Sequence, residues 1–279
     1  MGLEAGQNSN VIEIRAGNSD DPCAVTLTDT FLWDELPPTL TIYPDPGTSG
    51  DAILSSDATL TATGIDDLAL SQVCISVESS GSRSNCISGS SGARTLSVAL
   101  SLSGLSGAAT LNAYASDSIH WCGYPELLLT RTFFIDSEPP QVGIVSPLDA
   151  DPGSAVVAIS GTASDNVGLA SGNIRILDEA TGMYWDGSAF VPGTVSLPIG
   201  GLSGKLAFWS YAGLSAAVIP AEGGIWDVTV EATDLVGKTG SATERIIIRP
   251  KVVVKVPTPP ETCPGGGTNA ATGGSSYQN

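Results

Sequence analysis

Few residues in this chain have the types and spacing that catalysis or zinc binding requires. The single histidine, His120, lies in a turn-like stretch at residues 117–122, and no Gly-x-Ser-x-Gly nucleophile motif accompanies it. No Cys-x-x-Cys pair occurs, so the usual ligands of a structural zinc site are lacking. We therefore expect no catalytic residues, no cofactor-binding residues and no enzymatic activity.

Aspartates are the remaining candidates for site chemistry. Ca²⁺ takes six to eight oxygen ligands, and Asp136 together with Asp66 or Asp165 could begin such a set near the junction of two repeats. The alternative is that these side chains accept hydrogen bonds from backbone N–H groups and cap turns. We assign the aspartates to turns and commit to no metal site and no cofactor, with Ca²⁺ kept as the alternative.

Three tryptophans, Trp121, Trp185 and Trp209, are candidates for a surface platform that stacks on sugar rings. The competing interpretation is that most of them pack in a hydrophobic core, where large aromatic side chains bury the most apolar area. Both interpretations remain open for each tryptophan. If the platform exists, host or cell-surface glycans are its natural ligands.

Five cysteines cannot all pair within one chain. Cys74 and Cys86 flank the flexible turn at residues 79–84, which could bring two adjacent strands together. In an oxidising compartment these two cysteines would form a cross-strand disulfide. In a reducing one they would be two half-buried thiols.

Composition restricts the class of protein. With 279 residues there is room for two domains of about 100 residues each. The 33 Gly and 18 Pro favour short strands joined by turns over helices. The net charge of −18 argues against nucleic acid as a partner, because phosphate binding needs Lys and Arg. No apolar run has the length of a membrane span, and residues 1–7 lack the basic and apolar regions of a signal peptide.

A duplication organises the chain. Five positions match 99 residues apart, namely Asp66 with Asp165, Leu68 with Val167, Leu70 with Leu169, Ile75 with Ile174, and Val77 with Ile176. Residues 229–234 are similar in sequence to residues 112–117, and Pro139-Pro140 repeats Pro37-Pro38. Alternating apolar residues in each copy predict about seven strands. Residues 161–171 read as the end of one strand, a tight polar turn and the start of the next.

These patterns predict an all-β chain with two tandem β-sandwiches, at residues 37–138 and 139–250. Residues 1–36 are strand-like but unlike either repeat, and we expect them to dock on the first sandwich or on a partner chain. Residues 198–224 are too long for a hairpin loop and are expected to form an elaborated edge or contact surface. Residues 251–279 contain one strand-like run followed by a Pro/Gly/Ser-rich tail, which we expect to be extended.

Four segments of the second repeat, at residues 134–140, 162–168, 183–190 and 230–238, resemble bacterial immunoglobulin-like repeats of the Big type. The resemblance covers residues 139–249 well and residues 37–135 weakly, because the Tyr-Trp-Asp-Gly hairpin of the second repeat is missing from the first. Such repeats occur in surface adhesins, in accessory modules of secreted enzymes and in tailed-phage virion proteins. The resemblance implies immunoglobulin-like sandwiches that space, display or bind.

Two functions from different classes remain. The main hypothesis is a structural protein of a multi-subunit particle, such as a phage decoration, spike or tail component, located on the virion surface or tail. It is favoured by the absent leader, the odd number of cysteines, and terminal segments, 1–36 and 251–279, that could clasp neighbouring subunits. The alternative is a secreted or cell-surface bacterial adhesin or carbohydrate-binding module, favoured by the repeat type and the acidic, turn-rich composition.

Overall fold

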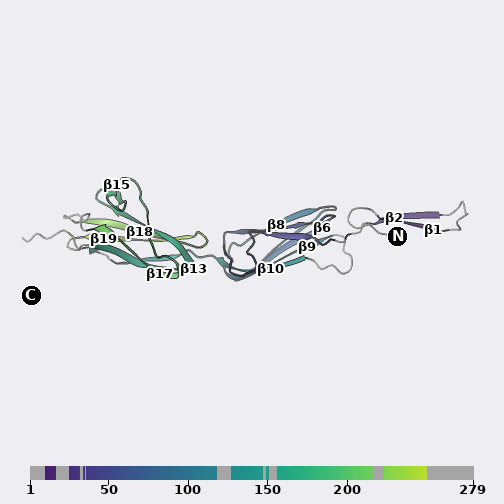
Figure 1. The fold of residues 1–279 in the computed structure, drawn as a ribbon, viewed down its shortest axis with the longest axis horizontal. Coiled ribbons are helices and arrows are strands. Elements are labelled where there is room, and N and C mark those ends of the chain that lie inside the picture. The colour runs from purple at the N-terminus through teal and green to yellow at the C-terminus, as the bar shows by residue number, and fades with distance from the viewer. Residues whose placement is uncertain are drawn as a thin grey trace, which may run out of the picture.

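The computed structural model describes residues 10–16, 25–31, 34, 36–117, 127–146, 149–150, 156–215 and 223–249. Strands dominate these residues, and no helix occurs among them. The molecule is elongated: a hairpin lies at one end, a first sandwich in the middle and a second sandwich at the other end (Figure 1). Trp121, His120 and the tail at residues 251–279 fall outside the described residues.

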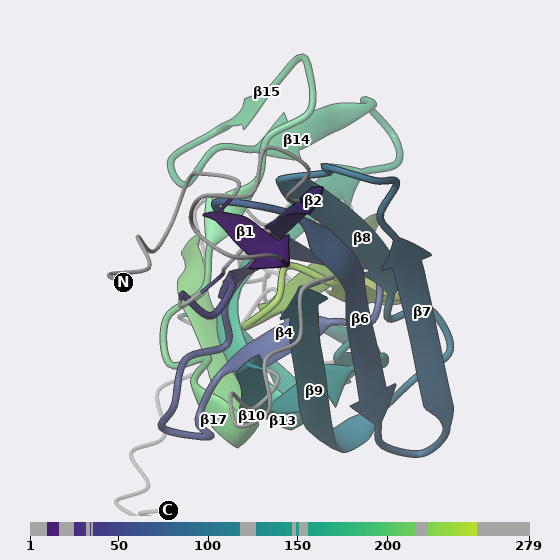
Figure 2. The same ribbon diagram turned by 90° about the vertical axis from the view of Figure 1, so that its right-hand side faces the viewer.

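Module 1, at residues 39–136, is a sandwich of two sheets. Its strands are β3 (Thr39–Tyr43), β4 (Ile53–Ser55), β5 (Thr59–Ile65), β6 (Leu70–Glu78), β7 (Ser82–Ser88), β8 (Thr95–Ser101), β9 (Gly107–Asp117) and β10 (Leu127–Asp136). One sheet has the order β3-β5-β8 and the other β4-β10-β9-β6-β7. Figure 2 shows β9, β6 and β7 side by side. Short β4 runs parallel to β10, and the other pairs are antiparallel.

Module 2, at residues 141–248, repeats this arrangement with one long strand in place of two. Its strands are β11 (Gln141–Ser146), β12 (Asp149–Ala150), β13 (Val156–Asp178), β14 (Met183–Trp185), β15 (Phe190–Val191), β16 (Leu197–Pro198), β17 (Gly204–Ser215), β18 (Gly224–Asp234) and β19 (Thr239–Ile248). The first half of β13 pairs with β11 and β17, and the second half with β18 and β14. Short β12 runs parallel to β19, as β4 does to β10. Both modules therefore have the immunoglobulin-like sandwich fold that the repeat pattern predicts.

Alternating side chains fill each core. In β18, for example, every second residue from Trp226 to Ala232 is fully buried, which places the apolar half of the strand between the sheets. The two cores are separate clusters, one in each module. Each module therefore has its own hydrophobic core, as the duplication predicts.

The predicted turn at residues 161–171 forms differently in the two copies. In module 1, β5 ends at Ile65 and β6 begins at Leu70, so Asp66 lies in a true turn. In module 2 the corresponding residues are a corner inside continuous β13, where the strand passes from one sheet to the other and the pairing register shifts after Ser164. The expectation of two separate strands there was wrong, because the chain turns the corner without leaving extended geometry.

The expected insertion at residues 198–224 is also corrected in part. Strand β17, with 12 residues, lies within this segment and is the regular third strand of a sheet, paired along β13. Residues 216–222 lie outside the described residues.

A separate two-stranded hairpin precedes module 1. It pairs β1 (Asn10–Ala16) with β2 (Val25–Phe31) in antiparallel register. The end of this segment nevertheless shares a motif with the end of module 1. Residues 30–38 read Thr-Phe-Leu-Trp-Asp-Glu-Leu-Pro-Pro, and residues 132–140, which end β10 and lead into module 2, read Thr-Phe-Phe-Ile-Asp-Ser-Glu-Pro-Pro.

Candidate metal centre

Three aspartates meet where module 1 joins module 2. Asp136 is the last residue of β10, Asp165 lies at the corner of β13, and Asp234 ends β18. Each can place one carboxylate oxygen so that all three atoms lie within 4.8 Å of one another. The side chains are buried, with exposed fractions of 0%, 8% and 2% respectively. Carboxylates are rarely buried unless they are paired, so three that converge at one buried point are an unusual arrangement.

Backbone N–H groups fix one oxygen of each carboxylate. The bonds to Oδ1 come from Val167 N and Gly168 N to Asp165 (2.8 and 2.6 Å), from Val236 N and Lys238 N to Asp234 (2.8 and 2.9 Å), and from Glu138 N to Asp136 (3.2 Å). These are the turn-capping bonds that the sequence predicts for aspartates in turns. They hold each side chain in one orientation.

The second oxygen of each carboxylate has no hydrogen-bond partner. Oδ2 of Asp136, Asp165 and Asp234 is inaccessible to solvent and accepts no hydrogen bond in the described structure. Unsatisfied buried carboxylate oxygens are costly, and a bound cation is one way to satisfy them. Turn capping and metal binding are therefore compatible here, because Oδ1 serves the first and Oδ2 is available for the second.

Electrostatics agree with this geometry. Burial raises the pKa of Asp136, and the carboxylates of Asp165 and Asp234 raise it further. The Glu138 N–H and the Lys238 ammonium act in the opposite direction. Asp136 therefore binds a proton more readily than an exposed aspartate does.

Module 1 has the same arrangement at its opposite end. Asp34, Asp66 and Asp117 form a second cluster within 4.8 Å. The Leu68 and Ala69 N–H groups donate to Asp66 Oδ1, as their counterparts do in module 2, and the Oδ2 atoms of Asp34 and Asp66 are buried without a partner. Burial and nearby carboxylates raise the pKa of Asp34. The duplication has therefore copied the whole cluster.

The donor set determines which cation fits. Carboxylate oxygens are hard ligands, which favours Ca²⁺ or Mg²⁺ over zinc or copper. Three carboxylates supply about half of the six to eight oxygens of a Ca²⁺ site, and carbonyl groups or water would supply the others. The residues present thus fit a divalent cation of this class.

One contact within module 1 and one between the modules surround this site. The Asp136 carbonyl accepts a hydrogen bond from Ser56 N of module 1 (2.8 Å), while its side chain points to module 2. Lys238 Nζ of module 2 forms an ion pair with Asp57 of module 1 (2.8 Å). A cation at Asp136 would therefore tie the last strand of module 1 to the corner of module 2.

The linker lies tightly against β19. A Cβ atom added at Gly240 would stand 1.8 Å from the Pro140 carbonyl oxygen, so only glycine allows this approach. The contact keeps the residues between Asp136 and β11 close to module 2.

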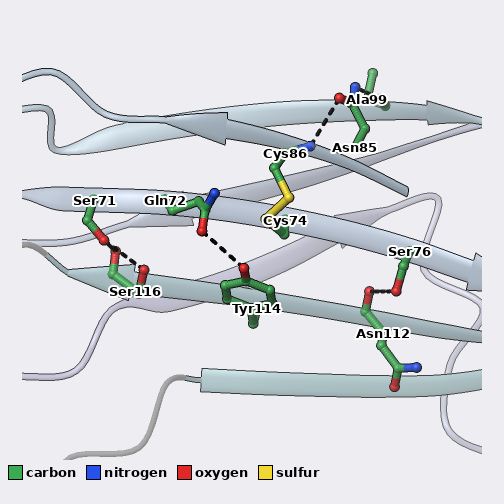
Figure 3. The surroundings of a disulfide bond; sticks show 10 residues. All are labelled: Ser71, Gln72, Cys74, Ser76, Asn85, Cys86, Ala99, Asn112, Tyr114 and Ser116. Carbon is green, nitrogen blue, oxygen red and sulfur yellow. Dashed lines mark hydrogen bonds between the residues drawn. A yellow bond between two sulfur atoms is a disulfide. The ribbon is translucent and has the colours of Figure 1, made fainter. Parts of the chain in front are cut away.

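Cys74 and Cys86 form a disulfide between β6 and β7, where they are directly opposed (Figure 3). Cys74 is buried and Cys86 is exposed at the outer strand of the sheet. The bond closes the edge hairpin of module 1.

The aromatic platform predicted from the sequence is not formed by the tryptophans in the described residues. Trp185 and Trp209 are each only 2% exposed and belong to the core of module 2. Trp185 donates its indole N–H to the Tyr211 hydroxyl and stacks against Phe190. Their size and the apolar surroundings explain the correction, because burying an indole ring between the sheets gains more than exposing it. Trp121 lies outside the described residues.

Comparison with known proteins adds a weak likeness of fold. No protein-family model matches the chain, and no curated protein is similar to it in sequence. Among solved structures it is similar to a bacterial ice-binding adhesin described for host cell-surface retention, with 15% identity, a TM-score of 0.36 and coverage of 77% of this chain and 66% of that one. For a Ca²⁺-stabilised adhesin of an Antarctic bacterium the identity is 16% and the TM-score 0.33, and the match covers 85% of this chain and 56% of that one. For the immunoglobulin-domain pair of DIP-gamma the identity is 10% and the TM-score 0.33, and the match covers 77% of this chain and 98% of that one.

The chain thus spans less than two thirds of either adhesin structure. These scores assign no function to it.

Sequence reasoning found the metal candidates only in part. It paired Asp136 with Asp66 or Asp165, and the structure brings Asp136 and Asp165 together while it places Asp66 in the other cluster. Asp34, Asp117 and Asp234 were missed. A signal was present, because Asp234 repeats Asp117, and Asp34 stands before Pro37-Pro38 as Asp136 stands before Pro139-Pro140.

Proposed function

We propose that this chain is a non-catalytic structural and display protein, a tandem of immunoglobulin-like modules that works outside the cell as a spacer. In this proposal Ca²⁺ binds at the junction formed by Asp136, Asp165 and Asp234 and makes the two modules a stiff unit. The observation that carries it is the set of three buried, unpartnered Oδ2 atoms contributed by both modules.

The second cluster supports the same proposal. Asp34 precedes module 1 in the way that Asp136 precedes module 2, so each module has a carboxylate cluster at the end where the preceding segment enters. A repeated cation site at each entry would give an array of modules a fixed direction. Spacing a binding surface away from its anchor requires such stiffness.

Two points support an extracellular location. The Cys74–Cys86 disulfide is typical of oxidising surroundings. Sites with few protein ligands bind Ca²⁺ at about 10⁻⁴ to 10⁻³ M, the range of extracellular modules. Both support the secreted or cell-surface interpretation, as in an adhesin. A virion surface is oxidising too, and the virion interpretation stays a prediction. Among the described residues no helix has the length and apolar character of a membrane span.

Small-angle X-ray scattering of the full chain tests this proposal. We expect one well-defined maximum dimension in Ca²⁺ and a broader distribution of interatomic distances in EDTA. The double variant Asp136→Asn/Asp165→Asn should give the broad distribution in both buffers. Identical scattering of the wild-type chain in Ca²⁺ and EDTA would refute the stiffening role.

A further inference from the structure

The β1–β2 hairpin ends in the same sequence motif as the β9–β10 hairpin of module 1, and both hairpins are antiparallel. When the two sequences are aligned so that Asp34 corresponds to Asp136, Leu27 corresponds to Leu129. In the structure Leu27 pairs with Ile14, and Leu129 pairs with Ala113. We treat the two hairpins as equivalent because the second strand of each is antiparallel to the strand before it and ends in the same sequence motif.

The two hairpins differ in what covers them. In module 1, Ala113 is fully buried and Leu129 packs against the core, because the sheet formed by β3, β5 and β8 lies over them. In the β1–β2 hairpin the equivalent side chains, Ile14 and Leu27, are 58% and 66% exposed. Within the described residues neither β1 nor β2 pairs with a third strand. The hairpin thus has an apolar face of the core type without a core.

We propose that β1–β2 is the closing hairpin of a third immunoglobulin-like sandwich, and that its apolar face binds the other strands of that sandwich. The partner is a segment of the same repeat type, with strands equivalent to β3 through β8. In modules 1 and 2 those strands come before the closing hairpin in the chain, so we assign the partner to a segment placed ahead of Asn10 in a tandem array.

The carboxylate cluster of Asp34, Asp66 and Asp117 gains a role from this assignment. It stands between β2 and module 1 as the Asp136 cluster stands between β10 and module 2. It is therefore a second junction site, between the third sandwich and module 1. This part rests on the proposed function, whereas the partner of the hairpin does not depend on a cation.

A fusion tests the assignment on the full chain. Residues 37–108 of the chain, which contain β3 through β8, are joined directly to Asn10, the counterpart of Ala109, so that the spacing of module 1 is kept. We expect backbone amides of β1 and β2 to exchange with solvent at least about a hundredfold more slowly in the fusion than in the unfused chain, because they enter a cooperative fold. A second fusion carries Ile14→Ala, since Ile14 is larger than Ala113 and could overfill the core.

Matched substitutions separate specific packing from general effects. Leu27→Asp on the apolar face should abolish the added protection, and Thr28→Asp on the opposite face should keep it. We expect the slowed amide exchange of β1 and β2 to persist in EDTA, because this packing does not depend on a cation. If Ca²⁺ had no effect on the chain, the proposed function would be refuted, but this assignment would not. Unchanged exchange in both fusions would overturn the assignment. It would also be overturned if the unfused chain formed dimers that Leu27→Asp dissociates, because the hairpin would then pack on a second copy.

Discussion

Replacing Asp136 by Asn reverses the usual expectation for a buried polar substitution. The amide oxygen of Asn keeps the acceptor for Glu138 N, while one of three negative charges is removed. At 4.8 Å and an effective dielectric constant near 20, two carboxylates repel each other by about 3 kcal/mol. Backbone N–H donors and Lys238 offset part of this repulsion. We therefore expect Asp136→Asn to be more stable than the wild-type chain in EDTA, by about 1–2 kcal/mol.

Ca²⁺ should remove that advantage. A site with a dissociation constant near 10⁻⁴ M stabilises the folded state by about 2.7 kcal/mol at about 10 mM free Ca²⁺. If the lost carboxylate weakens binding tenfold, the variant gains only about 1.4 kcal/mol under the same conditions. The wild-type chain and the variant should then have nearly the same stability in Ca²⁺.

Thermal and urea unfolding in EDTA and in Ca²⁺ measure these differences. Asp186→Asn is the matched control, because Asp186 also caps a turn through Oδ1 but is exposed and stands outside both clusters. Its effect should be the same in both buffers. The reasoning fails if Asp136→Asn is less stable than the wild-type chain in EDTA, or if both proteins gain equally from Ca²⁺.

Three further predictions concern pH, the linker and the disulfide. The pKa of Asp136 is raised in the folded protein, so its contribution to stability is present below the usual aspartate pKa of about 3.9 and is lost as pH rises through the raised pKa. In EDTA the stability advantage of Asp136→Asn over the wild-type chain should therefore grow from acid to neutral pH. A pH-independent difference in stability would contradict this. Gly240→Ala should push the Pro140 carbonyl away from β19 and lower the free energy of unfolding by about 1–3 kcal/mol. Gly237→Ala is the comparison for backbone strain alone, because a Cβ there meets no atom but φ is +88°. Equal X-ray scattering curves for Gly240→Ala and the wild-type chain would argue against a fixed linker. Replacing Cys74 and Cys86 together by Ser should lower the free energy of unfolding by about 3 kcal/mol, since the bond joins cysteines 12 residues apart, and should leave Ca²⁺ binding unchanged. Unfolding of the wild-type chain with and without reductant checks this. An unchanged unfolding midpoint would contradict it.

The fold was predictable because both its signals are local. Alternating apolar residues define the strands, and the 99-residue duplication defines two modules, each with its own core. The corner at Asp165 was not predictable as such, since the equivalent Asp66 lies between two strands in module 1, whereas Asp165 lies inside one strand in module 2.

The metal candidates were predictable only as aspartates. Which of them converge depends on how strands from different parts of the chain meet at the end of a sandwich, as Asp165 and Asp234 do. The fate of Trp185 and Trp209 depended on which face of a strand points inward. Their neighbours in sequence do not fix that face, because both faces of β17 carry aromatic side chains, with Phe208 77% exposed and Trp209 buried.

Isothermal titration of the cation-free chain with Ca²⁺ tests the central claim most directly. We expect saturable binding at two sites per chain, one for each aspartate cluster. The Asp136→Asn/Asp165→Asn variant should retain only the site formed with Asp66, and Asp186→Asn should retain both. The absence of saturable binding, or two unchanged sites in the double variant, would contradict the account.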